Sequence, residues 1–273
     1  MHVDTSFLIP AVFALVIAGA LAGFLSGLLG VGGGIVTVPV MFEIFRILDV
    51  DSDVRMHVAV ATSLATIIPT SIMSARSHHK RGAVDFGLLR VVGPTVLVGV
   101  LIGAVIADYL KGDVLTAVFG AVALVVAFYM FFRRDSWRLG PEFPRGVGGA
   151  AIGTTTGFLS TLMGIGGGTL GVPAMTLFNV PVHRAVGTCS AIGLIIGVPG
   201  AIGYVISGWG HPDLPPFSIG YVNILACVLL LPTILAVVPY GAKVAHSIGK
   251  EALQRVFGVF LLIVAVRMIT SLL

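Results

Sequence analysis

Charged side chains are scarce in this sequence of 273 residues: Asp, Glu, Lys and Arg together make up 10%, whereas 57% of the residues are hydrophobic. Soluble domains carry about 25% charged residues, so this composition excludes a soluble globular fold. The mean hydropathy is +1.07, and no polar segment is long enough to fold on its own. The sequence therefore predicts an all-α polytopic membrane protein with one integral membrane domain over residues 1–273.

The sequence also lacks the motifs that most catalytic and metal sites need. Its two cysteines, Cys189 and Cys227, lie in separate apolar segments and are not spaced as a metal or redox pair. No Lys-Ser/Thr pair follows the glycine-rich segments, as a phosphate-binding loop requires, and no nucleophile elbow is present. We therefore expect no enzyme activity, no cofactor and no metal site. The net charge of +4 comes from basic residues in short loops, which indicates membrane orientation rather than nucleic-acid binding.

Long apolar runs dominate the chain instead. A helix needs about 20 apolar residues to cross a bilayer. Six segments of this kind are expected to cross: about 56–75, 86–107, 113–132, 185–206, 218–240 and 256–272. Two further stretches, about 7–48 and 146–181, each contain a glycine cluster followed by a shorter arm. Arms of about 13–14 residues reach only about 20 Å, so each stretch is expected to form a hairpin with its glycine tip inside the membrane.

Lysine and arginine are distributed unequally between the expected loops. Twelve of them lie on one side, including those of RSHHKR (76–81) and RRDSWR (133–138), and four lie on the other side. The positive-inside rule places the richer side in the cytoplasm. Following the chain through the crossings then places both the N-terminus and the C-terminus outside.

Three sequence blocks occur twice in the same order. GFLSGLLGVGGG (23–34) matches GFLSTLMGIGGG (157–168), HVAVATS (57–63) matches HRAVGTC (183–189), and PTVL…VFG (94–120) matches PTIL…VFG (232–258). The blocks predict two inverted-topology repeats, about 1–133 and about 145–273. Each repeat is a broken glycine-tipped hairpin plus three transmembrane helices, an architecture typical of secondary transporters.

The glycine clusters are the main candidates for a binding site. Gly32, Gly33 and Gly34 are consecutive, as are Gly166, Gly167 and Gly168, so neither cluster can form one packing face of a helix. Each cluster is therefore expected to break the helix, and Pro39 and Pro173 are expected early in the arm that follows. The free N–H groups and positive dipole at the start of each arm favour an anion. A purely structural break is the alternative.

A few polar residues near the tips are further candidates. Thr62 and Ser63 correspond to Thr188 and Cys189 in the second repeat, and Ser190 and Thr37 are weaker candidates. Their hydroxyls could contact a substrate, or could hydrogen-bond to their own helices instead.

Two matched histidines, His57 and His183, each precede a crossing helix. They could carry a coupled proton or anchor the helix at the membrane interface. No acidic residue lies clearly in mid-membrane, which argues against a carboxylate proton relay.

The duplicated GFLSGLLGVGGG-type motif with its following proline resembles the TauE/SafE family of sulfite and organosulfur anion exporters over essentially the full chain. The resemblance implies a bacterial or archaeal plasma membrane protein that moves sulfite, a sulfonate or a related small anion. We therefore expect a secondary transporter, with export favoured, that works by alternating access around a midplane site and for which H⁺ or Na⁺ could be the coupling ion. An anion channel of the same fold and a non-transporting assembly or sensor protein are the alternatives. The direction of transport, the coupling ion and the oligomeric state stay open.

Overall fold

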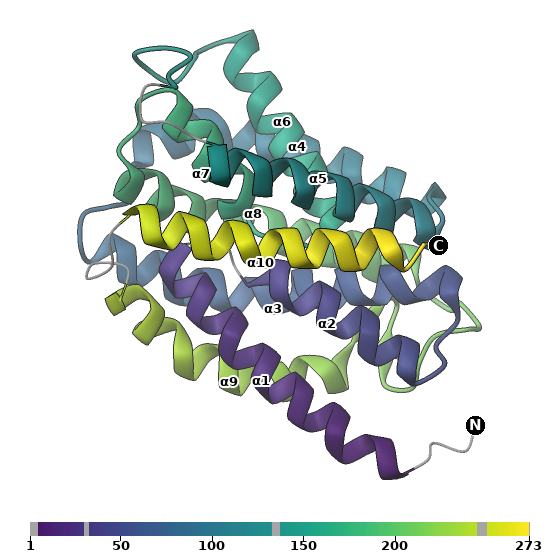
Figure 1. The fold of residues 1–273 in the computed structure, drawn as a ribbon. Helices are drawn as coiled ribbons and strands as arrows, with labels where there is room; N and C mark the ends of the chain where they lie inside the picture. The colour runs from purple at the N-terminus through teal and green to yellow at the C-terminus, as the bar shows by residue number, and fades with distance from the viewer. Residues whose placement is uncertain (1–4, 30–32, 133–136, 245–249, 273) are drawn as a thin grey trace.

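The computed structural model describes residues 5–29, 33–132, 137–244 and 250–272, and this part of the chain is almost entirely helical (Figure 1). The helices of the described residues are α1 (Thr5–Leu29), α2 (Gly34–Ile47), α3 (Ser52–His79), α4 (Phe86–Tyr109), α5 (Gly112–Phe132), α6 (Val147–Met163), α7 (Gly168–Leu177), α8 (Val182–Ser207), α9 (Ile224–Val244) and α10 (Lys250–Thr270). A short antiparallel hairpin, β1 (Ser218–Ile219) with β2 (Val222–Asn223), precedes α9.

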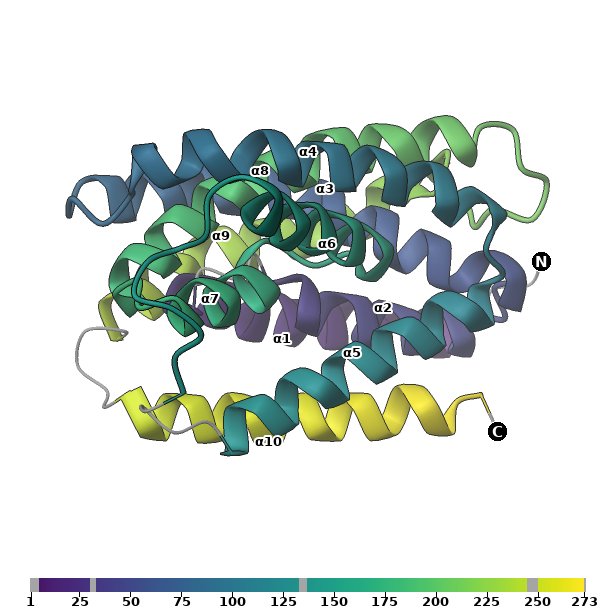
Figure 2. The ribbon, with the colours of Figure 1, turned by 90° about the horizontal axis from the view of Figure 1, so that it is seen from above.

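Five of these helices, α3, α4, α5, α8 and α9, are long and apolar enough to cross a membrane. They match five of the six segments expected to cross, and α10 covers most of the sixth. Figure 2 shows the long helices side by side with their axes roughly along one direction. The expected all-α, multi-pass membrane protein is therefore confirmed.

The helices pack in pairs that join the two halves of the chain. Helix α3 packs against α8, α1 against α9, α4 against α6, and α5 against α10, with the last pair along one edge of the bundle in Figure 2. Glycines upstream of the two clusters permit two of these contacts, because they let the helices approach closely. A Cβ on Gly23 would lie 2.9 Å from Cα of Ile234 in α9, and a Cβ on Gly157 would lie 2.9 Å from the carbonyl carbon of Val96 in α4.

Both glycine-containing stretches form a long helix followed by a short one. Helix α2 has 14 residues and α7 has 10. At 1.5 Å per residue these helices reach about 21 Å and about 15 Å, which is less than the hydrocarbon thickness of about 30 Å. The short arms after the clusters are as expected, and α7 is four residues shorter than α2.

Two expected boundaries were wrong. The segment expected to cross from 218 begins instead with the β1–β2 hairpin, and α9 starts at Ile224. Gly220 adopts a left-handed φ of 53° there, and a Cβ on it would lie 2.6 Å from Cα of Val205. Helix α3 also continues through most of the segment expected as a basic loop, because Arg76, His78 and His79 suit the negative end of its dipole.

The beginning of α1, the end of α10 and the connection after α8 lie at the same end of the bundle in both views (Figures 1 and 2). The connections between α3 and α4 and between α7 and α8 lie at the opposite end. For convenience we call the first the terminal end and the second the basic end.

Candidate functional site

The first helix break lies between α1 and α2 and depends on glycine. Gly33 is the N-cap of α2 with a left-handed φ of 78°, a conformation that other residues adopt only with strain. Its carbonyl accepts the N–H groups of Val36 at 3.0 Å and Thr37 at 3.2 Å. A Cβ on Gly33 would lie 3.0 Å from the carbonyl oxygen of Ala22 in α1, so the start of α2 lies directly against α1. Gly32 lies outside the described residues.

The second break lies between α6 and α7 and begins one residue after Met163. Gly164 is the C-cap of α6 with a left-handed φ of 65°. The N–H of Ile165 donates to the carbonyl of Ser160 at 3.0 Å, which closes the last turn. Gly166 is buried in non-helical backbone, Gly167 is the N-cap of α7, and Gly168 begins α7.

The structure brings the two breaks into direct contact. A Cβ on Gly34 would overlap the carbonyl oxygen of Gly164 and lie 2.9 Å from Cα of Ile165. A Cβ on Gly164 would in turn lie 2.8 Å from Cα of Val60 in α3. Backbone from α2, α3 and the second break therefore meets at this point with no room for any side chain.

Hydroxyl groups join the same elements. Ser63 in α3 donates to the carbonyl of Gly164 at 2.7 Å, and its Oγ lies 2.9 Å from Oγ1 of Thr37 in α2. Both side chains are buried. The structure thus places Thr37 and Ser63 next to the glycine breaks.

The matched threonines, Thr62 and Thr188, each accept a hydrogen bond from the residue just before another helix. The N–H of Asn223 donates to Oγ1 of Thr62 at 2.9 Å, and the N–H of Asp85 donates to Oγ1 of Thr188 at 3.0 Å. Asn223 and Asp85 are themselves caps, because their side chains accept N–H groups in the first turns of α9 and α4 at 2.9 Å and 3.0 Å. We call these two arrangements the threonine clamps. Sequence reasoning missed both capping residues, although a short polar residue before an apolar run is their usual signal.

Cys189, which matches Ser63, is fully buried in α8. Its Sγ lies 3.8 Å from Sδ of Met175 in α7, and a Cβ on Gly171 would lie 2.8 Å from that Sγ. The neighbouring Ser190 donates to the carbonyl of Val186 at 2.9 Å and lies 3.0 Å from Oγ of Ser74. The second copy of the sequence block thus has a thiol, packed against α7, where the first copy has the Ser63 hydroxyl.

The two matched histidines have different surroundings. His57 is buried, with Nδ1 3.0 Å from the carbonyl oxygen of Asp53 and Nε2 3.1 Å from that of Ala107. Its ring stacks on Tyr221 at 5.0 Å. Burial, and secondarily the Asp108 carboxylate, raises the pKa of the Tyr221 phenol, so that ring stays neutral. His183 is exposed at the basic end.

An open cavity of about 420 Å³ lies at the basic end. It is bounded by the beginnings of α4 and α8, the end of α7 and residues 141–145, and Arg145, Arg184, Asp85 and Glu142 supply its charges. The guanidinium of Arg184 lies 3.8 Å from the Asp85 carboxylate. The cavity therefore borders the clamp formed by Thr188 and Asp85.

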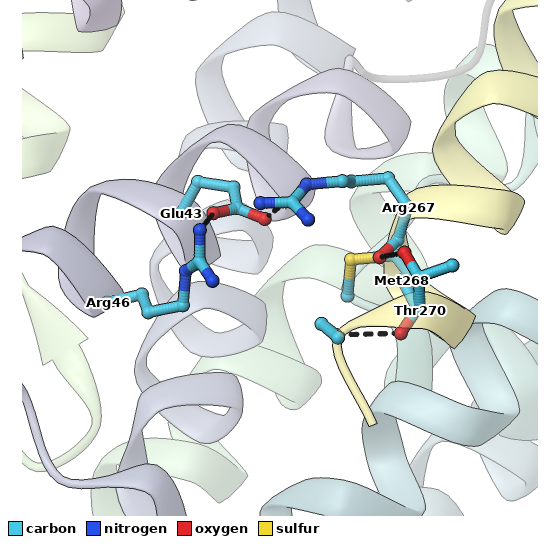
Figure 3. Close-up of polar contacts among 6 residues, drawn as sticks. Glu43, Arg46, Arg267, Met268 and Thr270 are labelled. Carbon is cyan, nitrogen blue, oxygen red and sulfur yellow. Dashed lines mark hydrogen bonds and ion pairs between the residues drawn. The ribbon is translucent and has the colours of Figure 1, made fainter. Parts of the chain in front are cut away.

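Glu43, an acidic residue of the short helix α2, was not among the candidates named from the sequence. Figure 3 shows Glu43 of α2 between Arg46 of the same helix and Arg267 of α10, at 2.8 Å and 2.9 Å. The carboxylate is about one-quarter exposed. This cluster ties the last turns of α2 and α10 together and carries one excess positive charge.

The prolines lie deeper in the short helices than expected. Pro39 and Pro173 are each the sixth residue of their helix, not part of its first turn. The carbonyl oxygens of Ile35 and Thr169 therefore lose the N–H donor that an uninterrupted helix would supply. Each short helix therefore lacks one backbone hydrogen bond close to its break.

Comparison with known proteins agrees with this architecture. The sequence model described as "Sulfite exporter TauE/SafE" matches residues 15–268. A "Probable membrane transporter protein" of Haemophilus influenzae is 31% identical over 252 residues, covering 92% of this chain and 96% of that protein. The "Probable membrane transporter protein YunE" of Bacillus subtilis is 28% identical, covering 93% and 96%. A relative from Methanocaldococcus jannaschii, with the same description, is 28% identical, covering 87% and 86%.

No solved structure matches the chain. The family match extends over nearly all of the sequence, and it includes both glycine breaks and the five described helices that are long and apolar enough to cross a membrane. The chain therefore belongs to the TauE/SafE family of membrane proteins.

Proposed function

We propose that the chain is a secondary transporter for a small anion, sulfite or an organosulfonate, which it exports across a bacterial or archaeal plasma membrane. The observation that carries the proposal is the contact between the two breaks, where Gly34 lies against Gly164 and Ile165. That two helix interruptions meet at one buried place supports a single binding site beside this contact, to which both breaks contribute. The family description and the transporter names of the relatives support the same function.

The chemistry of this spot suits a small anion. The N-termini of α2 and α7 each supply free N–H groups and about half a positive charge. Every described lysine and arginine lies within about two turns of a helix end or in a connecting segment. With so little fixed charge, a monoanion or partly charged dianion such as bisulfite/sulfite is favoured, and burying a bulky polyanion would cost several kcal/mol.

The helix pairing supports an inverted repeat of residues 1–133 and 145–273 within one integral domain. If α1 to α5 correspond to α6 to α10, then α1 on α9 is the counterpart of α6 on α4. The pairs α3–α8 and α5–α10 are each their own counterpart. In this proposal the two breaks belong to opposite sides of one site, as alternating access requires.

The repeat also makes a prediction about sidedness. A cysteine at His79, at the basic end, should be protected from impermeant thiol reagents in intact cells, whereas a cysteine at Pro212 should be labelled. The background must first lose Cys189 and Cys227, which are both buried. Labelling of both introduced cysteines would contradict the assignment of the basic end to the cytoplasm.

His57 is the proposed carrier of a coupling proton. Both of its ring nitrogens face backbone carbonyl oxygens, and a neutral imidazole can donate to one of them only. A protonated ring would satisfy both. His183 is exposed and lacks this burial, so we assign it to the interface instead.

Counterflow in liposomes tests the function. The purified chain should exchange labelled sulfite with saturation, and thermal-shift screening should show stabilisation by sulfite, thiosulfate, sulfoacetate or taurine. A proton gradient that accelerates transport by the wild type but not by His57→Gln would assign the coupling ion, and a response to a sodium gradient instead would assign Na⁺. Conductance proportional to the applied field would identify a channel, and a reconstituted chain that moves no anion would favour an assembly or sensor role.

A further inference from the structure

Three buried hydroxyl groups have no hydrogen-bond partner in the described part of the chain: Ser26, Ser160 and Thr169. Their exposed fractions are 0%, 0% and 1%. Leaving a buried polar group unsatisfied is unfavourable, so each such group needs an explanation. Other buried hydroxyls of this protein do find partners within their own helices, as when Thr161 donates to Gly157 and Thr116 donates to Gly112, both at 2.9 Å.

All three unpartnered hydroxyls flank the glycine breaks. Ser26 lies in the last turn of α1, Ser160 in the last turn of α6, and Thr169 in the first turn of α7. Ser26 is one turn beyond Ala22, the residue that contacts Gly33 at the start of α2, and residues four apart lie on one helix face. The backbone carbonyl of Ser160 accepts the N–H of Ile165 within the second break.

The two serines also occupy the same position of the duplicated motif. Ser26 is the fourth residue of GFLSGLLGVGGG and Ser160 is the fourth residue of GFLSTLMGIGGG. The same unsatisfied hydroxyl therefore occurs once beside each break. A packing accident in one helix would not explain its recurrence in the other.

We propose that Ser26 and Ser160 are direct ligands of the transported anion, with Thr169 as a third donor from one side. This inference rests on the proposed function and names the side chains of its site. Each hydroxyl can donate one hydrogen bond, and the adjoining helix N-termini supply N–H groups. A sulfite ion or a sulfonate head presents three oxygen atoms that accept such bonds. The ligand class is a compact oxyanion of this kind.

The test is Ser26→Ala and Ser160→Ala, singly and together, with sulfite as the probe. Each single change should weaken sulfite binding about tenfold, because a hydrogen bond to a charged group is lost. The thermal stability of the ligand-free protein should stay the same or rise, since an unsatisfied buried group is removed. Thr116→Val is the control, because it removes a buried hydroxyl that is satisfied within α5, and it should leave sulfite affinity unchanged.

The outcomes separate this inference from the function on which it rests. Wild-type binding and counterflow with unchanged affinity in both alanine variants would overturn the assignment of the serines and leave the transporter intact. A fall in ligand-free stability without a change in affinity would likewise overturn it, because the serines would then be structural. A wild-type protein that neither binds nor moves sulfite would overturn the proposed function and the serine assignment with it.

Discussion

Gly34→Ala is expected to abolish sulfite counterflow while the protein still inserts into the membrane. The new methyl group would overlap the carbonyl oxygen of Gly164 and lie 2.9 Å from Oγ of Ser63. Neither the backbone nor this engaged hydroxyl can give way cheaply, so the two breaks must separate. Counterflow of labelled sulfite into liposomes, with the amount of inserted protein measured in parallel, checks the result.

Gly148→Ala is the matched control for this change. Gly148 also lies in the first turn of a helix, but it is exposed, and a Cβ there would meet only Pro144, at ordinary distances of 3.4 Å and 3.8 Å. Alanine also favours the helix by about 1 kcal/mol relative to glycine, so this variant should transport as well as the wild type. Full activity of Gly34→Ala would mean that the contact between the breaks has no part in transport.

Gly33→Leu and Gly167→Leu extend the test to the N-cap residues of the two short helices, α2 and α7. A leucine at Gly33 would need a left-handed backbone and would meet Ala22, whereas one at Gly167 would meet Ile192 at 2.7 Å. Both variants should lose sulfite binding. Gly82→Ala isolates backbone strain, because Gly82 shares the left-handed φ and has open space around it. Unchanged binding in both leucine variants would leave the clusters as packing devices alone.

Local chemistry was sufficient to predict most of the helices. Apolar runs of about 20 residues gave the crossings, and consecutive glycines gave the two breaks, because both signals depend on few neighbouring residues. The expected start of α9 was wrong because residues 218–223 continue the apolar run that follows them. In the structure, Gly220 packs against Val205 and the chain turns there before α9 begins. That contact depends on tertiary packing and leaves no local sequence signal.

The site was predictable in its backbone and less so in its side chains. The glycine clusters and Ser63 could be named from the sequence, yet their contact joins residues about 100 positions apart, as in the hydrogen bond from Ser63 to Gly164. Residues at matching positions of the duplicated blocks also do not always have the same surroundings in the structure. His57 is buried whereas His183 is exposed, and Arg184, the neighbour of His183, lines the open cavity at the basic end.

The threonine clamps give the two opposite ends of the bundle equivalent contacts. One clamp ties α3 to the beginning of α9, and the other ties α8 to the beginning of α4. If the proposed alternating-access cycle operates, each end must open while the other stays closed. Hydrogen bonds between a hydroxyl and a single N–H group are weak enough to break in turn, because each contributes only about 1 kcal/mol net.

Thr62→Val is expected to destabilise the protein by about 1–3 kcal/mol, because it leaves the N–H of a buried residue, Asn223, without an acceptor. Thr188→Val should cost less, since Asp85 is partly exposed and water can replace the lost acceptor. Thr62→Ser keeps the oxygen and is the control. Thermal unfolding of the purified variants in detergent tests this order of stability. The wild type and Thr62→Ser should be the most stable, Thr188→Val less stable, and Thr62→Val the least stable.

The same variants decide whether the threonines also contact the substrate. A hydroxyl that accepts an N–H still has its own proton to donate, so a clamp threonine can bind an anion at the same time. We expect each valine change to weaken sulfite binding by about 1–2 kcal/mol, the usual loss for a hydrogen bond to a charged group. Unchanged sulfite affinity in both valine variants, alongside the loss of stability, would assign the threonines to the clamps alone and remove them from the site.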